Sequence, residues 1–222
     1  MLTQVTNRTN LNLAGCLKWL GITSGTIGIL GIVLPAISYA PSHPGFLPFT
    51  TYLSDMGATP IWPQVLFNTA MLINTPLRYL FLVLLILYLE QINAAKRSGG
   101  AMLIAGAISA AGTVIMTAVP YSLIPQIHEA GIPLFFLGIV ILQSLLGASE
   151  YKAKALPRVL PGLCFVVVAV YLVFFVLVML YEMGMIDRAA PIFPEWLCAM
   201  SLLVWVFAHS LILGKGEQTH QD

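Results

Sequence analysis

The chain has 222 residues, of which 59% are hydrophobic and 9% are charged, and its formal net charge is +1. With a mean hydropathy of +0.90, this composition excludes an ordinary soluble domain, and the small net charge gives no support for a nucleic-acid partner. Several apolar runs reach the length of about 20 residues that a helix needs to cross a bilayer. The sequence therefore predicts an all-α, polytopic membrane protein in which residues 1–222 form a single transmembrane domain.

Six spans form the predicted bundle, at residues 14–40, 62–89, 101–119, 128–149, 159–181 and 194–213. Eight basic residues flank alternate span ends, namely Arg8, Lys18, Lys96, Arg97, Lys152, Lys154, Arg158 and Lys215. The opposite ends have only Arg188. Because positively charged flanks stay in the cytoplasm, both termini are predicted to be cytoplasmic. A multi-pass protein of a bacterial inner membrane and one of a eukaryotic membrane fit these features equally.

Residues 51–68 crowd turn-forming and helix-starting residues into an otherwise apolar sequence. Ser54 and Asp55 can fold their side chains onto nearby backbone amides, and Pro60 and Pro63 suit a turn and the first residues of a helix. We therefore expect a polar loop here that leads into the second span.

The second span carries a polar stripe. At about 100° per residue its polar side chains fall within one arc of about 120°; they are Gln64, Asn68, Asn74, Thr75 and Arg78. Pro76 should interrupt and kink this span. The stripe predicts that Arg78 points into the bundle, where it either bonds to carbonyls freed by Pro76 or grips a lipid phosphate or carboxylate. No acidic residue is expected in any span at its depth.

Small residues in the first and third spans predict close helix packing. The first span contains Gly21, Gly25, Gly28 and Gly31, and the third contains Ala105, Gly106, Ser109, Gly112 and Thr113. The fifth span has no polar stripe and is expected to face lipid.

Acidic residues and one histidine map to the span ends opposite the basic ones; they are Asp55, His128, Glu129, Glu182, Asp187 and Glu195. They could act as general acids and bases, coordinate a hard cation, or satisfy loop backbones. In an enzyme, Asp55, His128 and Glu195 would meet as the catalytic groups. His128 would then carry the proton, because its unperturbed pKa of about 6.5 lies nearest to neutral.

Neither a metal site nor a cofactor site is predicted. His128 and His209 belong to opposite span ends, and the three cysteines, Cys16, Cys164 and Cys198, lack a shared end. A three-histidine zinc site or a thiolate site is therefore not expected. The expected lack of intramembrane acids also weakens a proton-coupled transporter.

Three motifs together resemble a known family. Tyr52-Leu-Ser-Asp-Met-Gly-Ala58, His128-Glu-Ala-Gly131 and Glu195-Trp196 are similar to motifs of the DRAM family. That family comprises damage-regulated autophagy modulators, their fungal relatives and post-GPI-attachment lipid-remodelling proteins. Met56 stands where the family usually has Thr, and Pro60-Ile-Trp-Pro63 lacks its acid. A bacterial family of uncharacterised six-span proteins has a similar arrangement of Ser-x-Leu-Gly and Phe-Asn.

The resemblance implies a bundle whose members handle or sense membrane lipids. The leading hypothesis is a non-enzymatic protein that binds or regulates lipid, with Arg78, Asn74, Asn68, Gln64, Ser54, Glu129 and Trp196 as ligand-binding residues. The alternative is a lipid-modifying enzyme that performs acyl transfer or hydrolysis, and the third is a transporter. Membrane lipids are the expected partners, and a membrane-protein partner or a second copy of the chain would also fit.

Overall fold

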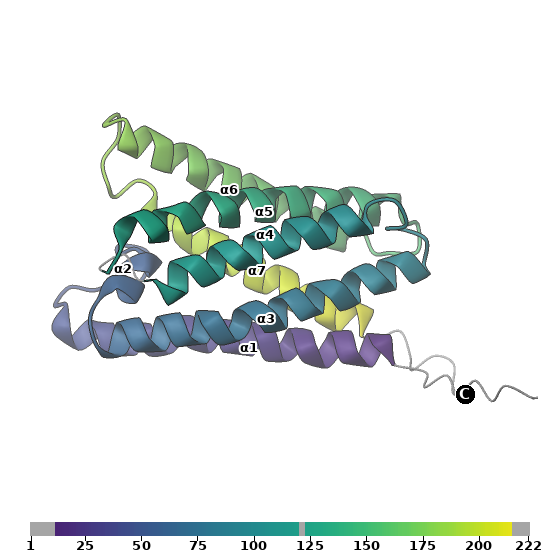
Figure 1. The fold of residues 1–222 in the computed structure, drawn as a ribbon, viewed down its shortest axis with the longest axis horizontal. Helices are drawn as coiled ribbons and strands as arrows, with labels where there is room; N and C mark the ends of the chain where they lie inside the picture. The colour runs from purple at the N-terminus through teal and green to yellow at the C-terminus, as the bar shows by residue number, and fades with distance from the viewer. Residues whose placement is uncertain (1–11, 120–122, 215–222) are drawn as a thin grey trace, which may run out of the picture.

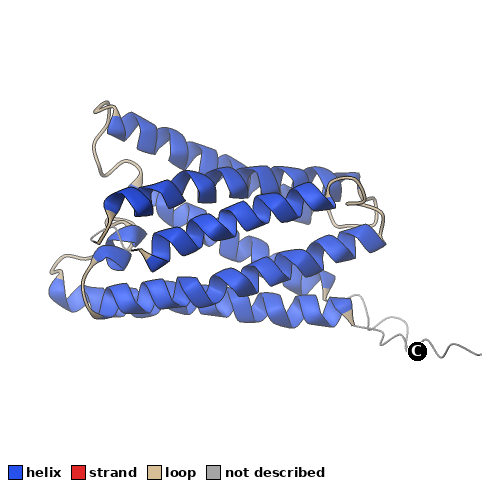
Figure 2. Ribbon diagram, in the orientation of Figure 1, coloured by secondary structure: helices blue, strands red, loops and turns tan. Residues whose placement is uncertain are grey.

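The computed structural model describes residues 12–119 and 123–214, and its long helices cross the whole length of the molecule (Figure 1). They are α1 (Leu13–Tyr39), α3 (Trp62–Gln91), α4 (Gly99–Ala118), α5 (Pro125–Lys152), α6 (Val159–Glu182) and α7 (Ile192–Leu213). A 3-10 turn, η1 (Ala40–Ser42), and a short helix, α2 (Leu53–Ala58), connect α1 to α3. All six long helices are long and apolar enough to span a membrane. The chain is thus an integral, multi-pass, all-α membrane protein (Figure 2).

The predicted spans agree closely with the observed helices. The largest difference is three residues at each end of α5, which was predicted as 128–149 and is found as Pro125–Lys152. That small extension matters, because it brings Glu150 inside a helix that the sequence ended one residue earlier.

Two local expectations are wrong. Residues 53–58 form the helix α2 rather than an irregular loop. Pro76 does not interrupt the second span, because α3 continues as one helix from Trp62 to Gln91. The expected kink stays a prediction. A proline leaves one helix carbonyl without its usual donor, and neighbouring side chains and helices in a bundle can tolerate that loss.

The helices pack as a closed ring. Each long helix contacts the next along the chain, and α7 returns to α1. The main core lies inside this ring, and among its fully buried side chains are Phe81, Leu146, Tyr171 and Trp205. Much of α6 faces outward with Val and Phe side chains, as its uniformly apolar sequence predicts.

Helices α4 and α5 approach each other at backbone distance. A Cβ atom added to Gly112 would lie 2.4 Å from the amide nitrogen of Phe135, and one added to Gly138 would lie 2.5 Å from that of Ser109. Only glycine allows two helices to meet this closely in lipid. The contact fixes Ser109 of α4 against α5, next to the polar interior described below.

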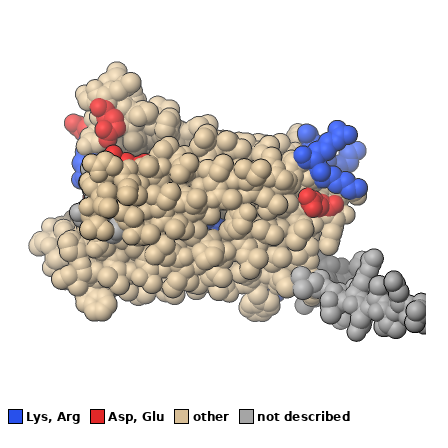
Figure 3. All heavy atoms as spheres, viewed as in Figure 1, with Lys and Arg blue, Asp and Glu red and all other residues tan. Residues whose placement is uncertain are grey.

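Charged side chains gather at the two ends of the bundle, and the surface between them is almost entirely uncharged (Figure 3). The α3–α4 and α5–α6 loops share one end and supply its basic residues, whereas α2 and the α6–α7 loop share the other end. Arg8 and Lys215 lie outside the described residues. Which end faces the cytoplasm stays a prediction.

Candidate functional site

At the acidic end of the bundle, an exposed ion pair and a tyrosine hydrogen bond connect α2 and the residue before it to the α6–α7 loop. Arg188 pairs with Asp55 of α2 at 2.8 Å, with 59% and 30% of the two side chains exposed. The Tyr52 hydroxyl donates to the carbonyl of Arg188 at 2.8 Å. Burial, followed by the negative charge of Glu195, raises the pKa of Tyr52 to about 12, so its phenol remains a donor at neutral pH. The exposed ion pair of Arg188 with Asp55 contributes little to the stability of the fold.

Glu195 and Trp196 fasten α2 to the start of α7. The Glu195 carboxylate accepts the backbone N–H groups of Leu53 at 2.6 Å and of Ser54 at 3.3 Å. The Trp196 indole donates to the carbonyl of Thr51 at 2.9 Å. Glu195 therefore caps free amides at the beginning of α2, which is a structural use of a carboxylate.

His128 belongs to the junction of α4 and α5. Its Nδ1 lies 2.9 Å from the carbonyl of Met116 and 3.1 Å from that of Val119. Because carbonyls only accept, Nδ1 carries a proton and donates to them. Glu129 is exposed on the same first turn. Asp55 and Glu195 thus meet around α2, whereas the His128 ring is bonded to the end of α4.

Three side chains of the polar stripe on α3 form hydrogen bonds with three different neighbouring helices. Asn68 donates to the Gly57 carbonyl of α2 at 3.3 Å, and Asn74 accepts from Ser24 of α1 at 2.7 Å. Arg78 donates to Thr113 of α4 at 3.2 Å. Gln64 is half-buried in the first turn of α3. Arg78 therefore points into the bundle as predicted, but the stripe does not line one continuous groove.

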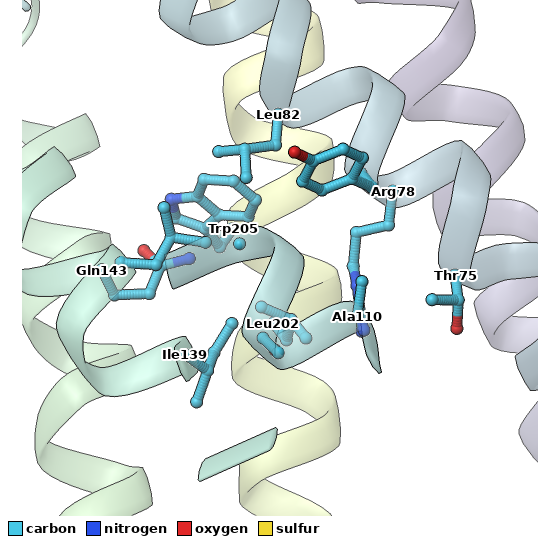
Figure 4. Close-up of a pocket in the computed structure, with 12 residues that line it drawn as sticks. Thr75, Arg78, Leu82, Ala110, Ile139, Gln143, Leu202 and Trp205 are labelled. Carbon is cyan, nitrogen blue, oxygen red and sulfur yellow. The ribbon is translucent and has the colours of Figure 1, made fainter. Parts of the chain in front are cut away.

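A small cavity lies beside Arg78, between α3, α4, α5 and α7 (Figure 4). Its empty space is about 350 Å³ when the open mouth is counted, but the part that a water can enter is about 20 Å³. About one water molecule needs that much room. Leu82, Ile139 and Leu202 supply apolar walls, while Arg78 and Gln143 supply polar ones.

Buried polar atoms at this cavity lack partners. The hydroxyl of Ser109 and both amide atoms of Gln143 have no hydrogen bond within residues 12–119 and 123–214. Both residues line the cavity, and Gln143 is completely buried. An unsatisfied buried polar group costs about 1–3 kcal/mol, so such groups in native proteins usually bind a water or another ligand.

A second polar cluster lies closer to the basic end. The Glu150 carboxylate is 3.0 Å from Nε2 of His209, and both side chains are fully buried. The Cys164 thiol is 3.5 Å from the other Glu150 oxygen. The expectation of no intramembrane acid is wrong, because Glu150 lies inside α5 with 1% of its surface exposed.

The sequence contained a signal for this cluster that the span boundaries concealed. Gln143 and Glu150 are seven residues apart, and Trp205 and His209 are four apart. Both spacings place side chains on one helix face. The apolar run ends near residue 149, however, so Glu150 resembled an ordinary residue of a loop.

A further hollow of about 290 Å³ opens between α1 and α3. Its lining is apolar apart from Thr69 and includes Leu30, Val65 and Ile73. It offers no charged group to orient a ligand, so the cavity at Arg78 is the stronger candidate for a specific site.

These features define a class: a six-span helical membrane protein with a polar interior. The chain belongs to the family described as "Protein of unknown function (DUF998)", whose model matches residues 25–212. The match includes Arg78, Gln143, Glu150 and His209, and it is not a match to the DRAM family. No curated protein and no solved structure matches the chain.

Proposed function

We propose that the protein binds a membrane amphiphile with a small anionic head group, a fatty-acid-like carboxylate, and does so without converting it chemically. The observation that carries the proposal is the guanidinium of Arg78 inside the bundle. The two ion pairs among the described residues are Arg188 with Asp55 and His209 with Glu150, so Arg78 has no acidic partner there. An arginine at the centre of a span costs about 2.5 kcal/mol or more, which favours a bound anion.

The chemistry of the cavity favours a negative ligand. Arg78 has five N–H donors and no acceptor, and the structure uses one of its nitrogens on Thr113. The Gln143 amide and the Ser109 hydroxyl add donors that have no protein partner in the described chain. A carboxylate accepts several such bonds at once, and the guanidinium fork matches its two oxygens.

The size and opening of the cavity favour a small head and an apolar tail. The part of the cavity that a water can enter, about 20 Å³, has no room for a phosphodiester with its substituents and favours a small head group. Arg78 is only half-buried, and the cavity beside it has apolar as well as polar side chains in its wall. Arg78 is the one basic residue near the middle of a described span. A head group could therefore enter from the bilayer while its tail stays in lipid.

The two other functions have less support. A lipid-modifying enzyme at the acidic end would need free carboxylates, yet Glu195 caps α2 and Asp55 pairs with Arg188. A transporter would need a pathway, and the described cavity at Arg78 is small. The resemblance of the Tyr52–Ala58 and His128–Gly131 motifs to the DRAM family stays a prediction, which agrees with lipid binding.

Equilibrium binding of a radiolabelled long-chain fatty acid to the purified protein tests the proposal. We expect saturable binding by the native protein and at least about tenfold weaker binding by Arg78→Leu, since charge-assisted hydrogen bonds contribute about 1.5–3 kcal/mol each. Arg78→Lys should also weaken binding, because the fork is lost. Arg188→Leu is the matched control and should bind normally.

Competition identifies the class of ligand. An unlabelled fatty acid should displace the probe, whereas a diacyl phospholipid and chloride should not. Full binding by Arg78→Leu would refute the site. Saturable binding of radiolabelled chloride by the native protein but not by Arg78→Leu, with no measurable binding of fatty acid, would show that the cavity holds a small inorganic anion instead.

A further inference from the structure

Three metal-ligating side chains from three helices converge at one buried point. Glu150 of α5, Cys164 of α6 and His209 of α7 each place one ligand atom within 4.8 Å of the other two. None of the three side chains has more than 1% of its surface exposed. The cluster lies about 10 Å along α5 from Gln143, at 1.5 Å for each of seven residues, so its three ligands are distinct from the residues that line the Arg78 cavity. Trp205 lies between the two sites and also lines the cavity.

The hydrogen bonds of His209 leave a lone pair directed at the carboxylate. Nδ1 lies 2.8 Å from the carbonyl of Trp205, and since a carbonyl only accepts, Nδ1 carries the proton. In the neutral ring Nε2 is therefore an acceptor, and it lies 3.0 Å from the Glu150 oxygen. Two acceptors at this distance need a positive species between them, which is either a proton or a metal ion.

Trp205 orients two of the three ligands. Its carbonyl holds the His209 ring, and its indole N–H donates to the Cys164 sulfur at 3.2 Å. Metal-binding histidines almost always donate their other ring nitrogen to a carbonyl or carboxylate in this way. The N–H bond to sulfur would stabilise the thiolate that forms when a metal ion replaces the thiol proton.

We propose that Glu150, Cys164 and His209 bind one divalent, thiophilic metal ion of the zinc class. One carboxylate and one thiolate together balance the double positive charge, so the occupied site is neutral, as a low-dielectric interior requires. A monovalent ion would leave an uncompensated negative charge there. A nitrogen, an oxygen and a sulfur ligand form a donor set that Zn²⁺ accepts.

The separations of the donor atoms fit this ion. Bond lengths of about 2.0–2.3 Å and tetrahedral angles place ligand atoms about 3.3–3.6 Å apart. The observed separations are 3.0 Å between Nε2 and the Glu150 oxygen and 3.5 Å between the second Glu150 oxygen and sulfur. These two separations involve different oxygens of Glu150, and one oxygen, the sulfur and the ring nitrogen together lie within 4.8 Å of one another. The side chains would therefore move closer by up to about 1 Å to complete three bonds, which leaves the fourth position for a water. The ion would link α5, α6 and α7 near the basic end.

Metal analysis of the purified protein tests the proposal, with an affinity tag that contains no histidine. We expect about one zinc per chain by elemental mass spectrometry, and loss to background in Cys164→Ser and in His209→Gln. Cys198→Ser removes another buried cysteine, in α7, and should retain the metal. Trp205→Phe keeps an aromatic side chain but loses the N–H bond to sulfur, and should bind the metal about 10–100-fold more weakly.

A Co²⁺ titration of the metal-free protein keeps the test decisive if a variant folds poorly. The native protein should develop a thiolate-to-cobalt absorption band that Zn²⁺ abolishes and that Cys198→Ser retains. A native protein that is metal-free and develops no band would overturn the proposal and leave a shared proton between Glu150 and His209. Metal retained by a well-folded Cys164→Ser, His209→Gln double variant would also overturn it. Neither result changes fatty-acid binding at Arg78, so the two proposals fail separately.

Discussion

The close approach of α4 and α5 makes Gly138→Ala a sensitive test of the fold. The added methyl group would lie 2.5 Å from the Ser109 nitrogen and 2.8 Å from both the Ala105 oxygen and the Ser109 Cα. These are backbone atoms, so no side-chain rotation relieves the contact, and the helices must move apart by nearly 1 Å to reach ordinary contact at about 3.5 Å. Overpacking of this kind costs about 1–3 kcal/mol.

The helix propensity of alanine offsets part of the cost of overpacking, because alanine is favoured over glycine by about 1 kcal/mol within a helix. We therefore expect Gly138→Ala to lower the free energy of unfolding by up to about 2 kcal/mol. Gly162→Ala in α6 is the matched control, because nothing lies within 4 Å of its added Cβ. It should be neutral or slightly stabilising.

The measurement is the melting temperature in detergent, which is obtained by size-exclusion chromatography of samples heated to increasing temperatures. Fatty-acid binding measured on the same samples adds a second readout. Ser109 lines the Arg78 cavity, so separation of α4 from α5 should also weaken binding. Equal melting temperatures for Gly138→Ala and Gly162→Ala would refute the account of the α4–α5 contact.

Two other predictions concern the ends of the bundle. Glu195→Ala removes the acceptor of the Leu53 and Ser54 amides and should cost about 0.5–2 kcal/mol, as loss of a helix cap does; an unchanged melting temperature would show that Glu195 is not a cap. A cysteine placed at Gln218, outside the described residues, should not react with a membrane-impermeant reagent in intact cells, because the basic flanks predict a cytoplasmic C-terminus. Efficient labelling from outside would show that the protein has the opposite orientation.

The spans were predictable because they depend on local hydropathy alone. Their ends agree with the helices to within three residues, and the small residues of the third span predicted the tight packing of α4. The inward direction of Arg78 was predictable for a similar reason, since a stripe on one helix face is a property of that helix.

The sites depended on neighbours that no local pattern specifies. Asn68, Asn74 and Arg78 share one face of α3, yet each meets a different helix because the neighbours change along the length of α3. Glu150 and Cys164 come together only when α5 and α6 pack. The capping of α2 by Glu195 likewise joins residues more than a hundred positions apart.

Crosslinking tests the central claim, that an anionic amphiphile binds at Arg78, most directly. A fatty acid with a photoreactive group near its carboxylate is bound to the protein in nanodiscs, irradiated, and mapped by peptide mass spectrometry. We predict labelling of the cavity wall, at Tyr79, Gly106, Ala110 or Gln143, and its loss in Arg78→Leu but not in Arg188→Leu. Labelling spread evenly over lipid-facing residues, or unchanged in Arg78→Leu, would contradict the claim.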